Sequence, residues 1–68
     1  MDTINFPHPK DPPGHTRVLA VKNAPPDVEI SLECACGAVL CRGVFEDDNL
    51  KNRSTVFAKG RERHRQHV

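Results

Sequence analysis

The chain has 68 residues, a net charge of +1, three phenylalanines, and neither tryptophan nor tyrosine. This length excludes more than one domain, and so small a core usually needs a metal, disulfides or a partner chain in addition to packing. The near-zero net charge also argues against a broad electrostatic surface for nucleic acid.

Residues 1–16 form a proline-rich segment. Proline removes backbone donors and keeps its neighbours extended, so this segment is predicted to be a flexible or polyproline-like arm. The remaining residues, 17–68, are predicted to be a zinc-finger-like domain. His8 and His15 lie within the arm and are expected to be exposed and not to act as ligands.

Two strands are predicted next. Residues 17–21 are a short β-prone run that ends at a turn or linker around Pro25 and Pro26. In residues 28–34 the apolar side chains alternate with polar ones, which is the period-two pattern of a strand with one buried face. This alternation predicts that Cys34 points inward.

Gly37 supplies a tight turn, after which residues 38–42 return as the second strand of a β-hairpin. The acidic cluster at residues 46–49 suits a loop or a helix N-terminus, where carboxylates meet the positive end of the helix dipole. A helix is predicted from Leu50 onward; an alternative start lies near Ser54. The predicted fold class is therefore small α+β.

One face of the predicted helix is expected to pack on the hairpin. Its members follow one another at steps of three and four residues: Leu50, Arg53, Phe57, Gly60, His64 and His67. Glycine weakens a helix by roughly 1 kcal/mol relative to alanine. Gly60 nevertheless lies on this face, and a glycine at such a position indicates that the helix approaches the hairpin closely there.

All three cysteines lie between residues 34 and 41. Three cysteines cannot all pair within one chain, and Cys34 and Cys36 are too close in sequence to bridge without strain. No secretory signal or membrane span is visible, so a reducing cytoplasm is the expected location. Thiols in that setting are more often metal ligands or catalytic groups than cross-links.

The cysteines and the last two histidines together predict a structural zinc site. Structural Zn²⁺ takes four ligands in a tetrahedron, and we expect these to be Cys34 and Cys36 from the turn with His64 and His67 from the helix. Cys41 is the alternative fourth ligand in place of His67. In the competing interpretation, Cys36 and Cys41 are small core residues and the histidines belong to a solvated basic tail.

A hairpin with two cysteines followed by a helix with two histidines resembles the Cys2His2 (ββα) zinc fingers. It is similar to the short CxCG…HxxH proteins of actinobacteria and their phages. The likeness covers residues 28–67, and it implies ligand roles for the four residues just named. The gap between Cys36 and His64 is more than twice that of the familiar DNA-binding finger. For this reason the base-reading positions of that finger do not carry over.

Catalysis is not expected, because four protein ligands leave neither an open metal position nor a pocket for a substrate. A dithiol redox role for Cys34 and Cys36 is the remaining enzymatic interpretation, but no βαβ pattern surrounds them. No small-molecule substrate and no membrane contact are predicted. The expected function is binding, in a regulatory role.

Two kinds of partner remain open. The helix offers a set of basic residues that could contact nucleic acid: Arg53, Lys59, Arg61, Arg63 and Arg65. The same charges could simply solvate the outer face of the helix. The alternative function is a protein-interaction adaptor, such as a phage-encoded modulator of a host protein, that uses the hairpin edge or the proline-rich arm.

Overall fold

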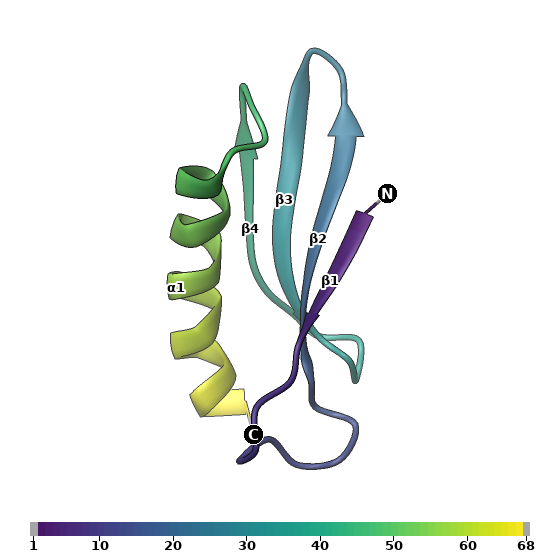
Figure 1. The fold of residues 1–68 in the computed structure, drawn as a ribbon, viewed down its shortest axis with the longest axis vertical. Coiled ribbons are helices and arrows are strands. Elements are labelled where there is room, and N and C mark those ends of the chain that lie inside the picture. Colours follow the sequence, from purple (N-terminus) through teal and green to yellow (C-terminus); the bar gives the residue numbers. More distant parts are fainter. Residues whose placement is uncertain (1, 68) are drawn as a thin grey trace.

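The fold is a four-stranded antiparallel sheet with one helix packed against it (Figure 1). The computed structural model describes residues 2–67. The elements are β1 (Asp2–Phe6), β2 (Arg17–Ala24), β3 (Asp27–Cys34), β4 (Val39–Phe45) and α1 (Leu50–His67). The strands lie side by side in chain order. This architecture confirms the predicted small α+β fold with a hairpin followed by a C-terminal helix.

Strands β2 and β3 form the centre of the sheet, and both were predicted. Their register places Leu19 opposite Leu32 and Arg17 opposite Cys34. The period-two pattern holds in β3, since Cys34 is only 2% exposed and faces the core. The two strands are joined at Pro25 and Pro26, as the proline pair predicts.

Strand β1 was not predicted. Residues 2–6 pair with β2, with Asp2 opposite Val21 and Phe6 opposite Arg17. The interpretation of residues 1–16 as a polyproline-like arm is therefore wrong for residues 2–6. The prolines begin only at position 7, so these five residues keep their backbone donors. The Phe6 ring also packs on Phe57 of α1, with centroids 5.0 Å apart.

A β-bulge interrupts the pairing of β3 with β4. Leu32 lies opposite Cys41 and Glu33 opposite Val39, so Leu40 has no partner across the strands. Because the extra residue breaks the alternation, the consecutive residues Leu40 and Cys41 are both buried. The carbonyl of Leu40 accepts a hydrogen bond from Arg63 at 2.9 Å, which ties α1 to the bulge.

Helix α1 begins as the acidic cluster suggests. The side chain of Asn49 accepts a hydrogen bond from the backbone N–H of Asn52 at 2.8 Å, which caps the first turn. Val56, Gly60 and His64 are its buried residues. Leu50 was expected on the buried face but is 79% exposed, because it lies in the first turn, beyond the core cluster. Within residues 2–67, no helix combines the length and the apolar character needed to cross a membrane.

Candidate metal centre

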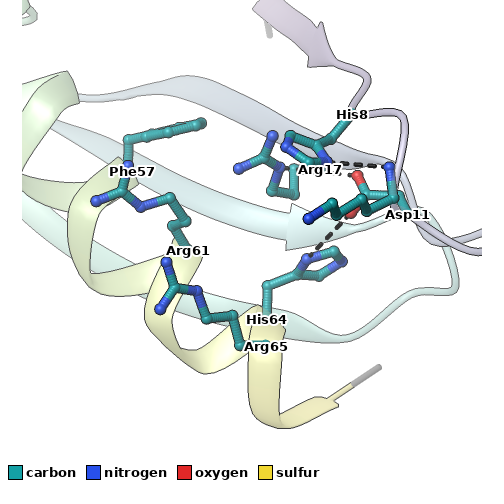
Figure 2. A pocket seen from close by; sticks show the side chains of 8 residues that line it. His8, Asp11, Arg17, Phe57, Arg61, His64 and Arg65 are labelled. Atoms are coloured by element: carbon teal, nitrogen blue, oxygen red, sulfur yellow. Dashed lines mark hydrogen bonds and ion pairs between the residues drawn. The ribbon is translucent and has the colours of Figure 1, made fainter.

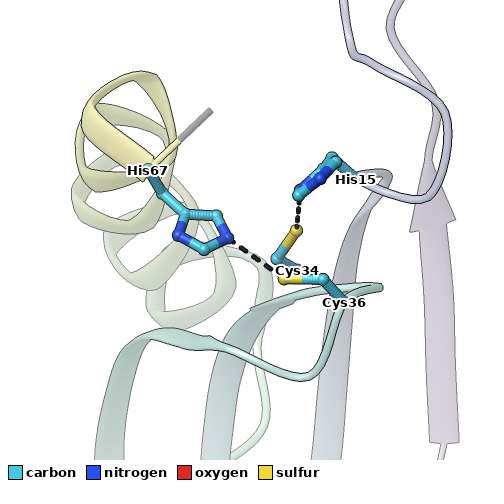
Figure 3. Close-up of side chains that lie close together, drawn as sticks. All are labelled: His15, Cys34, Cys36 and His67. Carbon is cyan, nitrogen blue, oxygen red and sulfur yellow. Dashed lines mark hydrogen bonds between the residues drawn. The ribbon is translucent and has the colours of Figure 1, made fainter.

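Three segments that are distant in sequence meet at one end of the sheet (Figure 1). These are the loop between β1 and β2, the turn between β3 and β4, and the C-terminal end of α1. Each contributes to a cluster of four side chains, which Figure 3 shows pointing toward one another: His15, Cys34, Cys36 and His67. One ligand atom from each residue lies within 4.8 Å of the other three. We call this group the candidate metal centre, or metal centre for short, because its four ligand atoms could hold one metal ion.

The turn between β3 and β4 directs both thiols to the same side. The backbone N–H of Gly37 donates to the carbonyl of Cys34 at 2.9 Å, and the N–H of Cys34 donates to the carbonyl of Ala38 at 2.8 Å. Gly37 has a φ of +106°, which favours glycine over residues with a side chain. The predicted glycine turn is therefore present, and it brings Cys36 back toward Cys34.

Backbone donors also point at the sulfur atoms. The pKa of Cys36 is lowered to about 7, first because the backbone N–H of Ala38 donates to its sulfur and then because His67 interacts with it. Burial raises the pKa of the Cys34 thiol, although the backbone N–H of Cys36 partly opposes this effect. Donors that favour the thiolate suit a metal ligand, because the thiolate is the form that binds metal.

The two imidazoles come from the loop and from the helix. His15 is half-buried, and its Nδ1 lies 3.3 Å from the sulfur of Cys34. The loop is held against the turn because the N–H of Ala35 donates to the carbonyl of Thr16 at 2.9 Å. His67 lies in the last turn of α1, and its Nε2 is 3.1 Å from the sulfur of Cys36.

These positions fit a tetrahedral metal ion. Zinc bonds of about 2.3 Å to sulfur and about 2.0–2.1 Å to nitrogen place neighbouring ligand atoms roughly 3.3–3.8 Å apart. The two closest sulfur–nitrogen separations, 3.1 and 3.3 Å, are near this range, and no pair exceeds 4.8 Å. The four atoms are therefore close enough together for a single zinc ion to bind all of them after small side-chain movements. Two thiolates and two imidazoles are a donor set that zinc prefers.

His64, which the sequence predicts as a ligand, lies outside this group. Its side chain is buried, and its Nε2 donates to the backbone carbonyl of His15 at 2.9 Å. Its Nδ1 is 3.8 Å from a carboxylate oxygen of Asp11. A nitrogen that carries a proton has no free lone pair for a metal. The structure thus brings together Cys34, Cys36 and His67 as predicted and places His15 where His64 was expected.

His15 was expected in an exposed arm, and that expectation is wrong. The position of His15 follows from the register of β2 with β3, which pairs Arg17 with Cys34. In an antiparallel pair, residues just before Arg17 must lie beside residues just after Cys34. His15 therefore lies close to Cys36 once this register is known. Cys41, the alternative ligand, lies in the hydrophobic core and outside the metal centre.

The chain was compared with protein-family models, with curated proteins and with solved structures. None of them matches it. The resemblance to zinc fingers therefore depends on the hairpin, the helix and the four clustered ligands, and no family membership supports it.

The basic residues predicted to contact nucleic acid differ in their surroundings. Arg53 forms two hydrogen bonds to the carboxylate of Asp48, at 2.6 and 2.7 Å, and this contact lowers the pKa of Asp48. Arg63 donates to the carbonyl of Leu40. Lys59, Arg61 and Arg65 are exposed, and the last two line a pocket described below. Contact of these five residues with nucleic acid stays a prediction.

The lowered pKa of Cys36 depends first on a local contact, the backbone N–H of Ala38 two residues away, and a local turn can persist in a protein that has lost its cooperative fold. It therefore leads to a testable prediction for the metal-free protein. A thiolate is present above the pKa of its thiol, so Cys36 should become reactive near pH 7, whereas an ordinary cysteine needs a pH near 9.0. We expect alkylation by iodoacetamide to modify Cys36 before Cys34 and Cys41, with a rate that rises through a midpoint of about 7. Peptide mass spectrometry at several pH values measures this order. Equal rates at the three cysteines would contradict it.

Proposed function

We propose that this protein is a small, non-catalytic zinc-binding module. Zinc is held by the thiolates of Cys34 and Cys36 and by the imidazoles of His15 and His67. The observation that supports the proposal is the convergence of four metal-binding atoms from three separate segments within 4.8 Å.

The proposed role of the metal is structural. Four protein donors fill a tetrahedral site, whereas catalytic zinc keeps one position for water or substrate. The ion would join the loop before β2, the turn after β3 and the end of α1, which packing alone holds weakly in a protein of 68 residues. His64 would act next to the site, because its hydrogen bond to the carbonyl of His15 holds the backbone of that ligand.

Metal binding by ligand variants tests the proposed set. Cobalt(II) is a suitable probe because its visible absorption reports tetrahedral coordination and sulfur ligands. We expect His15→Ala and Cys36→Ser to weaken cobalt and zinc binding at least about 100-fold, because each removes one of four ligands. His8→Ala is the matched control: His8 lies in the same loop but is exposed and outside the metal centre. It should bind metal as the parent protein does.

The competing ligand set makes a different prediction for the same experiment. If His64 is the ligand, His64→Gln should abolish the tetrahedral cobalt spectrum while His15→Ala retains it. Glutamine keeps an N–H donor that can reach the carbonyl of His15, so the substitution preserves the hydrogen bond better than alanine does. That pair of results would contradict the proposed site and restore the set predicted from the sequence.

We propose two alternative kinds of binding partner for this module. Contact with nucleic acid would use the exposed residues Lys59, Arg61 and Arg65, and it should weaken steeply as salt rises. A protein partner could instead add to the outer edge of β4, where Val39 and Val44 are 57% and 63% exposed. Such an apolar contact should persist at high salt. A cytoplasmic location stays a prediction.

A further inference from the structure

A second site lies beside the metal centre, between the loop that follows β1 and one flank of α1. It is a hollow of about 720 Å³ that shares no residue with the four proposed ligands (Figure 2). Most of its lining is charged: Lys10, Asp11, Arg17, Arg61 and Arg65, with Phe57 as an apolar wall. The hollow is large enough for a small molecule.

Positive charge dominates this pocket. Arg61 and Arg65 are four residues apart and project from the same flank of α1, and Lys10 and Arg17 come from the opposite wall. Four cations thus surround the single carboxylate of Asp11. Arg65 also has Glu62 at 3.7 Å, but both side chains are about 70% exposed, so solvent screens this pair strongly.

Arg17 lacks the partners that a buried arginine normally has. Its side chain is only 11% exposed, and its nearest carboxylate oxygen, on Asp11, is 3.8 Å from Nε. Its guanidinium lies over the ring of Phe57, 5.2 Å from the centroid. Among residues 2–67, neither the Nε of Arg17 nor one oxygen of Asp11 has a hydrogen-bond partner. These two atoms are the pair that lie 3.8 Å apart, too far for a hydrogen bond, so Arg17 and Asp11 attract each other without satisfying each other's hydrogen-bonding capacity, and the guanidinium of Arg17 can take a further acceptor.

Asp11 does not cancel the positive field of the pocket. Its carboxylate lies 3.8 Å from the Nε of Arg17, whose positive charge offsets it, and 3.8 Å from the Nδ1 of His64. Lys10, Arg61 and Arg65 remain as surplus cations at the rim, where all three are exposed. An anion entering the hollow would therefore meet donors from both walls before it meets the carboxylate.

We propose that this pocket binds the phosphate group of a small phosphorylated molecule. Phosphate offers several oxygens to several guanidinium groups at once, and arginine is well suited to such contacts. A small ligand fits better than a nucleic acid strand, because the cations converge on one hollow. Of the remaining lysines and arginines of α1, Arg53 and Arg63 are paired within the protein, and Lys51 and Lys59 lie outside the pocket. A strand would need cations along a track.

Amide chemical shifts in the metal-loaded protein, followed during titration, test this proposal. The probes are inorganic phosphate, phenyl phosphate, and phenol as the counterpart that lacks phosphate. We expect saturable shifts in residues 8–17 and 57–65 with both phosphates and none with phenol. The ratio of the two phosphate affinities shows whether the natural ligand is free phosphate or a phosphate ester.

Charge-matched variants localise the binding. Arg61→Gln and Arg65→Gln should each weaken phosphate binding about tenfold, because each removes a charged hydrogen-bond donor. Lys59→Gln removes the same charge from the same helix outside the pocket and should leave the affinity unchanged. All three residues are exposed, so the variants are expected to fold.

Two results would overturn the proposal. One is the absence of a saturable shift at about 10 mM phosphate. The other is an oligonucleotide without a terminal phosphate that binds more tightly than phenyl phosphate and loses affinity equally in the Lys59→Gln and Arg61→Gln variants. That second result would assign the basic residues to a nucleic acid strand. Neither result bears on zinc binding, which the cobalt spectra report separately.

Discussion

Removal of zinc by a strong chelator is expected to abolish the cooperative thermal unfolding transition of this protein. Structural zinc contributes about 10–16 kcal/mol in zinc-finger peptides, whereas a domain of this size has a total stability of roughly 3–10 kcal/mol. The four ligands also come from segments that no disulfide joins, since all three cysteines are free. Circular dichroism during heating, with and without chelator, measures the effect.

Restoring zinc should restore the transition, and magnesium should not, because magnesium prefers oxygen ligands. At zinc concentrations that just saturate the parent, the Cys36→Ser variant should behave like the chelated protein. Acid should act in the same direction as the chelator, because protons compete with the metal for thiolates and imidazoles. A chelated protein that melts as the parent does would show that the core alone stabilises the fold.

Gly60→Ala is expected to destabilise the protein by about 1–3 kcal/mol, even though alanine favours helices by roughly 1 kcal/mol relative to glycine. A Cβ at position 60 would lie 2.5 Å from Cδ2 and 2.7 Å from Cβ of Leu32, which is closer than real contacts allow. Leu32 is fully buried in the centre of the sheet and cannot move aside without disturbing the core. Urea unfolding of the zinc-loaded variant measures the loss.

Ser54→Ala is the control, because Ser54 is an exposed residue of the same helix. That substitution should be neutral or slightly stabilising. A double variant with Leu32→Ala tests the proposed contact. Leu32→Ala alone should cost about 2–5 kcal/mol, and the additional cost of Gly60→Ala should be smaller in its presence, because only Cβ of residue 32 remains close. Additive costs would show that the effect of Gly60 arises elsewhere.

Local patterns were sufficient to predict much of the fold. The alternation in residues 28–34 predicts β3 and the burial of Cys34, and Gly37 predicts the turn. Gly60 on the buried helical face correctly predicts close approach to the hairpin. These features depend on side-chain periodicity and on backbone freedom, which neighbouring residues determine. By contrast, β1 was missed because the nearby prolines dominate the composition of the first 16 residues.

Local sequence patterns could not predict which of His15 and His64 belongs to the metal centre. His64 and His67 lie on one helical face, so the sequence alone predicts both of them equally well as ligands. The helix passes over the sheet in such a way that His64 is covered by the loop and His67 reaches the turn beyond β3. Arg63, which precedes His64, donates a hydrogen bond to the carbonyl of Leu40 in the bulge and so links this part of α1 to β4.

The sequence by itself determined the strand that carries Cys34, the glycine turn that returns Cys36 toward it, and the helix that carries His67. Each depends on residues within a few positions of one another. Only the tertiary structure decided that His15 joins them and that His64 does not. That decision depends on the register of β2 with β3 and on the position of α1 over the sheet, and both arise from packing between residues distant in sequence.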